Sequence, residues 1–436
     1  MRCYITAALL SSSQFTGIRH KLVASALESP LESLSKQIIN QQQALTLDPQ
    51  TNPYVPGAGT PPPELAGRDS ILDEAKIAIQ RIRLGNTARS FIFVGLRGVG
   101  KTVLLNEVQA IADQDGALTD FLEASANEPL SVSIIGTLRT ALLKLDRAKG
   151  VSEKVKKGLR VLKSYAGAIK IKYGNVEFSV DVDAETGTAD SGKLSRDLAD
   201  LFIAAGEAAK ARDTAIVILI DEFQNLSGED FEALIMVIHR IDQKQLPLMV
   251  VGAGLPLLIK LTGDAKSYSE RLFDYPEIGP LDEAEAHRAL VAPAREGGIE
   301  FDDEAVRHII DRTKGYPYFL QEWGYQAWNC ADGSPITAGD VGQAEQRAVE
   351  RLDKNFFRSR YERLSDPQKT YLRAMARLGP GPHKTGDVAD VMGKTSSQLG
   401  PTRDALITNG MIYSPKYGYA AFTVPLFDEF MRRAET

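Results

Sequence analysis

Short continuous apolar runs alternate along the chain with stretches whose apolar residues recur at helical spacing. The runs of buried-strand length predict strands at 91–94, 118–122, 216–220, 248–251 and near 273–278. Apolar positions three or four residues apart predict helices from residue 70, over 103–112, over 194–211 and over 231–241. Strands that alternate with helices indicate an α/β fold, with a parallel sheet covered by helices on both faces.

One stretch, at about 144–193, departs from this alternation. It begins with a basic helical segment over 144–163, which has two interpretations: a solvated helix face or a site for phosphate contacts. Apolar and polar residues then alternate over 169–173 and again over 176–182, on either side of Gly174-Asn175. This alternation predicts a β-hairpin within an insertion.

The two ends of the chain have patterns of their own. Residues 1–63 are predicted to be a poorly structured arm, because 48–63 is rich in Pro, Gly and Thr. Residues 64–280 then form the α/β part, 281–352 a helical lid and 353–436 a last domain. That last domain has predicted helices at 366–378, 386–392 and 396–409, the third broken near Gly400-Pro401, and a two-stranded wing over 413–423. This order predicts a winged helix.

Composition excludes several classes of protein. A chain of 436 residues with 43% hydrophobic and 25% charged residues has enough apolar material for several domains. Two cysteines and five scattered histidines provide neither a disulfide framework nor a metal-ligand cluster. A net charge of -6 leaves nucleic-acid binding to a local patch. The apolar runs are too short to cross a membrane, so we expect a cytoplasmic protein.

A phosphate-binding loop follows the first strand. The segment fits G-x-x-x-x-G-K-[ST] and consists of Gly95, Leu96, Arg97, Gly98, Val99, Gly100, Lys101 and Thr102. Glycines let backbone N–H groups turn toward a phosphate, and the N-terminus of the next helix adds its dipole. Lys101 can reach the β- and γ-phosphates, and the Thr102 hydroxyl can bind Mg²⁺. We therefore expect ATP, or a close purine triphosphate, with Mg²⁺.

An acidic pair, Asp221-Glu222, ends the most hydrophobic strand. Asp221 is positioned to hold Mg²⁺, and Glu222 to polarise the water that attacks the γ-phosphate. The alternative is a polar strand end with no catalytic role. Since a P-loop lies upstream, the pair favours ATP hydrolysis.

With its P-loop, acidic pair and helical segment after the last strand, the chain resembles the AAA+ superfamily over roughly residues 54–433. More narrowly, it is similar to the archaeal-type ATPases allied to origin-recognition initiators and to STAND signalling ATPases. The segment Tyr54, Val55 and Pro56, followed by Gly67-Arg68-Asp69, is similar to the one that packs against adenine in these families. Its alternative interpretation is a proline-rich linker with a helix cap.

The resemblance also implies roles for two residues after the acidic pair. Arg271 lies where these families place an arginine finger, which would act on a neighbouring subunit of a homo-oligomer; a salt bridge to Asp274 or Glu277 is the alternative. Pro317, in Gly315-Tyr-Pro317, resembles the nucleotide-contacting proline of STAND lids, or simply begins a helix.

Two family features are missing. Gly252-Ala253-Gly254 replaces the polar sensor residue after the fourth strand, and no sensor arginine lies beside 315–321. We therefore expect slow hydrolysis and a nucleotide-controlled switch.

The predicted winged helix has two candidate partners. The first is double-stranded DNA, which its third helix and wing would contact through Lys394, Gln398, Arg403 and Lys416. The second is a protein partner, with the winged helix autoinhibitory as in a STAND-like signalling ATPase. The third helix carries little positive charge, and this leaves both open.

Overall fold

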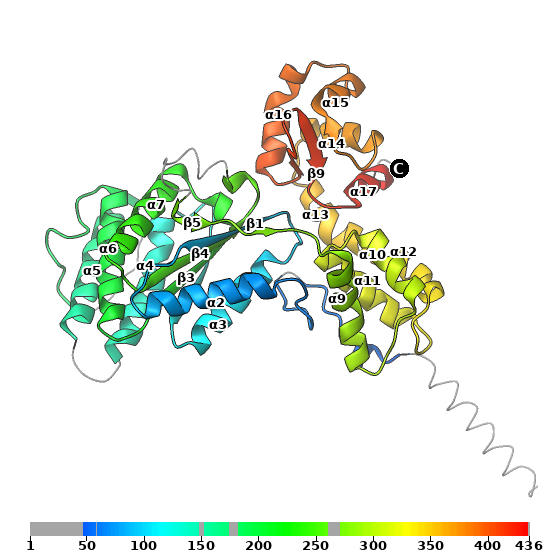
Figure 1. The fold of residues 1–436 in the computed structure, drawn as a ribbon. Helices are drawn as coiled ribbons and strands as arrows, with labels where there is room; N and C mark the ends of the chain where they lie inside the picture. Colours follow the sequence, from blue (N-terminus) through cyan, green and yellow to red (C-terminus); the bar gives the residue numbers. More distant parts are fainter. Residues whose placement is uncertain (1–46, 58, 148–151, 174–181, 260–270, 435–436) are drawn as a thin grey trace, which may run out of the picture.

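A computed structural model describes residues 47–57, 59–147, 152–173, 182–259 and 271–434 of the chain. Figure 1 shows a sheet flanked by helices, a cluster of helices beside it and a smaller C-terminal part above that cluster. None of the described helices is long and apolar enough to cross a membrane.

The main sheet is parallel, as expected for an α/β fold, with strand order β2-β3-β4-β1-β5 and with β6 also paired to β1. Its strands are β1 (Ser90–Gly95), β2 (Leu118–Glu123), β3 (Ile216–Asp221), β4 (Leu248–Gly254), β5 (Phe273–Asp274) and β6 (Glu277–Ile278). The strands predicted from apolar runs are confirmed. The central strands β1, β3 and β4 are buried along their whole length and are mostly apolar, as expected of parallel strands covered on both faces, whereas the edge strand β2 is half-buried and contains polar residues.

Helices cover both faces of this sheet. Successive strand residues point to opposite faces, so Phe93 and Val217 join the core beneath α2 and α3, whereas Ile92 and Ile218 join the core beneath the other helices. Figure 1 shows α2 and α3 together in the foreground. The helices are α2 (Asp69–Arg83), α3 (Lys101–Gln114), α4 (Leu130–Arg147), α5 (Glu153–Tyr173), α6 (Leu194–Lys210) and α7 (Gly228–Gln243).

The hairpin predicted after residue 168 is wrong in its first strand. Residues up to Tyr173 belong to α5, which buries Leu162, Tyr165 and Ile169 and leaves Ile171 89% exposed. The buried residues recur at helical spacing, so the alternation over 169–173 is a short coincidence at the helix end. The predicted turn and much of the second strand, 174–181, lie outside the described residues.

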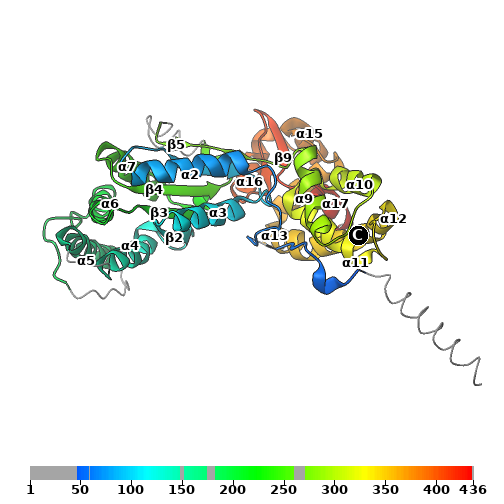
Figure 2. The ribbon, with the colours of Figure 1, turned by 60° about the horizontal axis from the view of Figure 1, so that its bottom comes forward.

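The helical cluster contains α9 (Glu283–Glu296), α10 (Asp303–Thr313), α11 (Pro317–Cys330) and α12 (Ala338–Leu352). We call this cluster the lid. A π-helical turn, Asp353–Phe357, and the short helix α13 (Arg358–Tyr361) continue from α12 toward the C-terminal part. Figure 2 shows the lid and the C-terminal part side by side at one end of the sheet.

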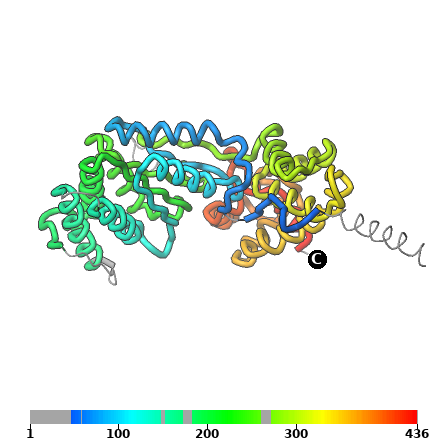
Figure 3. The backbone as a smooth tube through the Cα atoms, turned by 90° about the horizontal axis from the view of Figure 1, so that it is seen from below, coloured from blue at the N-terminus to red at the C-terminus, as the bar shows by residue number. Residues whose placement is uncertain are grey.

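The arm predicted to be poorly structured is ordered over 47–57 and 59–63, and Figure 3 shows it in dark blue beside the lid. The Leu47 N–H donates to the carbonyl of Ala331 at 3.3 Å, and the indole of Trp328 donates to the carbonyl of Asp48 at 3.0 Å. The segment includes the 3-10 turn Pro49–Thr51. Its content of Pro, Gly and Thr predicted a lack of regular structure, but its backbone forms hydrogen bonds with residues of the lid. Residues 1–46 lie outside the described part.

The C-terminal part, residues 366–433, combines helices with a small antiparallel sheet of order β7-β9-β8. Its elements in chain order are α14 (Asp366–Arg377), β7 (His383–Lys384), α15 (Thr385–Val391), α16 (Ser396–Thr408), β8 (Ile412–Tyr413), β9 (Tyr419–Phe422) and α17 (Phe427–Arg433). Three helices, α14 to α16, precede the antiparallel strands β8 and β9, and their assignment as a winged helix stays a prediction.

The predicted break at Gly400-Pro401 is wrong, because α16 continues through Pro401. A capping box between Thr395 and Gln398 stabilises the start of this helix. Proline removes one N–H, whose i−4 carbonyl partner belongs to exposed Ser397, where water can replace it.

Candidate nucleotide-binding site

The loop between β1 and α3 has the backbone that a phosphate-binding loop requires. Gly98 and Gly100 have φ of 82° and 92°, in the left-handed region that glycine adopts without strain. A side chain on Gly95 would meet the carbonyl oxygen of Ile278 at 2.2 Å, so only glycine fits there. The loop opens directly onto the N-terminus of α3, which begins at Lys101. Inward N–H groups and the helix dipole therefore favour an anion at this point.

Lys101 lies at the centre of the loop. Its ammonium donates to the carbonyls of Gly95 at 3.0 Å and Leu96 at 2.8 Å. Burial lowers the pKa of Lys101 to about 8, although nearby Glu222 and Asp221 favour the charged form. A buried cation of this kind is stabilised by a phosphate.

Thr102 and Asp221 meet as a metal site for a nucleotide requires. The Thr102 hydroxyl donates to Asp221 Oδ2 at 2.6 Å, bringing the start of α3 to the end of β3. One hydroxyl and one carboxylate beside a phosphate loop fit Mg²⁺, which takes oxygen ligands and relies on substrate phosphates for the rest. When bound, Mg²⁺ would neutralise charge on the phosphates. Thr102 and Asp221 would hold it.

Glu222 is held in an unusual backbone conformation, with φ of 50°. Its carboxylate accepts a hydrogen bond from the side-chain amide of Gln224. The Oε1 of Gln224 accepts from the Leu255 N–H, at 3.0 Å, just after β4. A side chain on Gly254 would lie 2.5 Å from that oxygen. Gln224 therefore occupies the place next to β4 where the sequence lacks a polar sensor residue.

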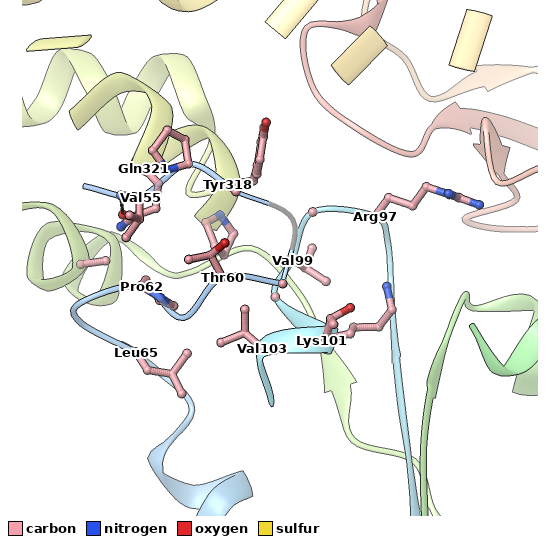
Figure 4. A pocket seen from close by; sticks show the side chains of 18 of the residues that line it. Val55, Thr60, Pro62, Leu65, Arg97, Val99, Lys101, Val103, Tyr318 and Gln321 are labelled. Atoms are coloured by element: carbon pink, nitrogen blue, oxygen red, sulfur yellow. Dashed lines mark hydrogen bonds between the residues drawn. The ribbon is translucent and has the colours of Figure 1, made fainter. Parts of the chain in front are cut away.

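A cavity of about 320 Å³ extends from the P-loop to the lid. Val55 and Pro56 line it from the N-terminal segment, and Pro317 and Tyr318 line it from the start of α11. Figure 4 shows Val55, Tyr318 and Lys101 around this space. Pro317 is also the first residue of α11, so both interpretations of this proline fit. The cavity has apolar walls at one end and the phosphate loop at the other, as a nucleotide requires.

Tyr54 does not line the cavity, contrary to its expected place against the adenine. It is 1% exposed, its hydroxyl donates to the carbonyl of Leu290, and its ring lies against Gly324 of α11. Its size and its hydroxyl suit it better to this core position in the lid. Val55 and Pro56, its neighbours in sequence, face the cavity instead.

Other predicted residues lie at different distances from this cavity. Residues 97–102 line it, whereas Gly95 and Leu96 contribute carbonyls to Lys101 from behind. Arg271 is exposed and does not line it. Its proposed salt-bridge partner Asp274 binds Arg89 at 2.8 Å.

The DNA-contact candidates divide by exposure. Lys394, Gln398 and Lys416 are exposed, although Gln398 also caps α16 and the Lys416 ammonium lies 4.1 Å from the centre of the Tyr419 ring. Arg403 is half-buried, with its Nε enclosed and without a hydrogen-bond partner among the described residues. Arg403 is therefore the least suited of the four to reading DNA.

Further residues reach the cavity from distant segments. The sequence analysis named Arg68 only as part of Gly67-Arg68-Asp69 and missed Phe356 and Arg360. Arg68 is 7% exposed and donates to the carbonyl of Gly279 at 2.6 Å, tying the N-terminal segment to the end of β6. Phe356 and Arg360 enter from the linker after the lid. Arg68 belongs to a segment with a recognisable pattern. The linker residues belong to no motif and are found only through the fold.

Comparison with known families agrees with this geometry. Residues 64–251 match the AAA ATPase domain family. The chain contains an AAA ATPase domain. Residues 354–431 match a domain family of unknown function, DUF8462. No curated protein matches the chain in sequence.

The fold of the chain is similar to that of the Walker-type ATPase PABY2304 of Pyrococcus abyssi. That similarity has a TM-score of 0.52 at 16% identity, over 86% of this chain and 97% of the other. Weaker similarities include Aeropyrum pernix Orc1 in complex with DNA, at 14% identity over 86% and 94% of the chains, TM-score 0.44. Cdc6p of Pyrobaculum aerophilum has 15% identity over 89% and 99%, TM-score 0.45.

The AAA ATPase match ends before the lid. It includes Lys101, Thr102, Asp221 and Glu222, the residues predicted to bind the phosphates, the metal and the attacking water. The residues that close the cavity from the lid and linker, such as Pro317, lie after residue 251. The P-loop and the acidic pair thus lie within the matched domain, and the residues that cover the cavity come from the rest of the chain.

Proposed function

We propose that the chain binds and slowly hydrolyses ATP, and that the nucleotide controls how the C-terminal part sits against the P-loop. One observation carries the proposal: Arg97 of the P-loop lies against Gly410, between α16 and β8. A side chain on Gly410 would come within 2.9 Å of Arg97 Nε. Figure 4 shows Arg97 extending from the loop toward the pale red ribbon of the C-terminal part. A conformational change in the P-loop would therefore alter its contact with the C-terminal part directly.

The lid supports the same coupling. The Tyr318 N–H donates to the carbonyl of Gly98 at 3.4 Å, and the Tyr318 ring stacks on Phe356 with ring centres 5.0 Å apart. On the far side of the lid, the Tyr316 hydroxyl donates to the carbonyl of Thr423 at 2.7 Å. P-loop, lid and C-terminal part thus form one contiguous network, as a switch between two arrangements requires.

Hydrolysis is proposed from the roles of Glu222 and Lys101. Lys101→Ala should abolish nucleotide binding, because it removes the buried cation beside the phosphates. Glu222→Gln should retain ATP binding and trap ATP, because an amide is a poor base for the attacking water. Binding is measured with a fluorescent nucleotide and turnover by phosphate release. Normal hydrolysis by Glu222→Gln would show that another group activates the water.

We propose that the C-terminal part is a winged helix that binds double-stranded DNA. The exposed positions of Lys394, Gln398 and Lys416 support this. Lys394 lies just before α16, Gln398 lies on it and Lys416 lies between β8 and β9, while Gly410 faces the P-loop. The test is duplex affinity across a salt series, with ATP and then with ADP. A steep salt slope that changes with nucleotide supports DNA binding. No binding even at low salt overturns it.

The second candidate is a STAND-like signalling switch in which the docked C-terminal part is autoinhibitory. The contact of Arg97 with Gly410 favours it, because the C-terminal part is docked against the P-loop. Exchange of ADP for ATP would release it from there. Under this function, ATP should increase amide exchange over 396–422 relative to ADP, with no DNA present. Equal exchange in both nucleotides counts against it.

Arg271 is proposed as an arginine finger toward a second copy of the chain, and its exposure supports this. Mixing Arg271→Ala subunits with wild type should depress hydrolysis more than dilution alone. Turnover that simply follows the wild-type fraction would rule out a role across an interface.

A further inference from the structure

Two arginines from distant parts of the chain line the nucleotide cavity together. Arg97 comes from the P-loop, and Arg360 comes from α13, in the linker between the lid and the C-terminal part. Burial, and next the charge of Arg97, lower the pKa of Arg360 to about 10, while Glu222 favours its charged form. Arg360 therefore lies within electrostatic reach of both the P-loop and the acidic pair.

Contacts within the linker hold Arg360 in place. Its guanidinium lies over the Phe356 ring, 3.9 Å from the ring centre, and donates to the Phe356 carbonyl at 2.5 Å. Phe356 itself lies 3.7 Å from where a side chain on Gly98 would begin. The linker before it is a π-helical turn, Asp353–Phe357, a conformation that often marks functional sites. The arginine is thus positioned by a rigid aromatic contact with the P-loop.

Asp221 and Glu222 share this cavity with its positive charges, but the two arginines have no direct carboxylate partner among the described residues. Within the described part of the chain, neither Arg97 nor Arg360 forms an ion pair with a carboxylate, and the buried Nε of Arg97 has no hydrogen-bond partner. Lys101 adds a third positive charge. Like charges brought together in a partly buried site destabilise one another until an anion joins them. The cluster is therefore built for a highly charged anion.

We propose that Arg360 binds the terminal phosphate of ATP, with Arg97 beside it, so that the linker distinguishes ATP from ADP. This rests on the proposed nucleotide binding. The terminal phosphate is favoured because Arg360 lines the same cavity as Glu222, the residue expected beside the attacking water. No sensor arginine lies beside residues 315–321 of the lid. Arg360, which lies outside the lid, supplies a positive charge in its place. Loss of the terminal phosphate would remove its contact with Arg360. The nucleotide would then no longer bind the linker.

The test is the ratio of ATP to ADP affinity in the full chain, measured by titration calorimetry with Mg²⁺. Arg360→Gln should weaken ATP binding at least about tenfold, as loss of a charge-assisted contact does, and ADP binding much less. Arg358→Gln is the matched control, because Arg358 lies on the same short helix and is exposed. Arg360→Lys should restore part of the ATP preference, since it keeps the charge.

The outcomes separate this inference from the function on which it rests. An unchanged ratio in Arg360→Gln, with wild-type ATP binding intact, overturns the role of Arg360 and leaves the ATPase assignment standing. Absence of ATP and ADP binding in the wild-type chain overturns both. Melting temperatures and circular dichroism of each variant verify that a lost preference does not reflect a lost fold.

Discussion

The Arg312 guanidinium of α10 forms a two-pronged ion pair with Glu429 of α17, at 2.7 and 2.6 Å, and so joins the lid to the C-terminal part. Its Nε also binds Glu345 of α12 at 2.5 Å. Hydrogen bonds to Arg312 lower the pKa of Glu429, as expected for a carboxylate facing a guanidinium. Both partners are about a quarter exposed, at 26% and 29% of the side chain. This pair fastens the two parts on the side away from the P-loop.

Arg312→Ala should loosen the C-terminal part from the lid, because it removes the cation that Glu345 and Glu429 share and leaves Glu429 only its ion pair with Arg433 of its own helix, at 3.6 Å. We expect a loss of about 1–3 kcal/mol in the interaction of the two parts. Amide exchange in α17 should rise, and limited proteolysis should cut the linker sooner. Arg307→Ala, an exposed arginine on the same helix, is the control. Unaltered exchange in α17 after Arg312→Ala would contradict a fastening role.

Gly324→Ala should destabilise the lid, because the added methyl would lie 2.7 Å from the Tyr54 ring. Overpacking of this kind costs about 1–3 kcal/mol. Gly342→Ala, in α12, meets nothing within 4 Å and should instead stabilise by about 0.5–1 kcal/mol, since alanine favours helix more than glycine. The two variants are compared by thermal melting. Equal melting points would show that the N-terminal segment does not pack on α11.

Thr102→Ala should reduce the effect of Mg²⁺ on nucleotide affinity, because it removes the hydroxyl that contacts Asp221. The enhancement of ATP binding by Mg²⁺ should fall about 10- to 100-fold, with binding in EDTA nearly unchanged. Thr102→Ser keeps the hydroxyl and should behave as wild type. If Mg²⁺ enhanced ATP binding equally in all three proteins, Thr102 would not be a ligand.

Asp242→Asn should stabilise the protein at pH 8 but not at pH 4. Burial raises the pKa of Asp242 to about 6 in the folded chain, above its ordinary value. The folded state therefore holds this proton more tightly than the unfolded state, and stability falls as pH rises through about 6. After allowance for its partial exposure, the gain from Asn should be about 1–2 kcal/mol. Melting temperature at the two pH values measures it.

The control for that comparison is Asp146→Asn, an exposed carboxylate at the end of α4. It should show no comparable difference between pH 4 and pH 8. A gain from Asp242→Asn of the same size at both pH values would point to packing or helix propensity in α7 and not to charge.

Local patterns determined the catalytic half of the site. The residues from Gly95 to Thr102 lie on one continuous turn, so their spacing alone specifies the phosphate loop. Asp221 and Glu222 follow a strand whose apolar run predicts its burial. The carboxyl ends of parallel strands lie at one edge of a sheet, so the loop and the acidic pair had to meet.

Short sequence patterns that no motif or long apolar run supported gave wrong predictions of secondary structure. The alternation over 169–173 suggested a strand, but the faces of α4 and α6 bury a helix there. Pro401 suggested a break, but a capping box and a solvated carbonyl let α16 continue. In each case a signal of a few residues was outweighed by packing or capping around it.

The sequence alone predicted a parallel sheet, a P-loop with its acidic pair, a helical lid over 281–352 and the element order of the C-terminal part. Only the tertiary structure decided that Tyr54 belongs to the lid core, that the side chain of Gln224 lies beside Gly254 at the end of β4 and that Arg360 enters the cavity. The physical reason is distance along the chain. Side chains that meet across separate elements leave no periodic or spaced pattern, because their contact depends on how those elements pack.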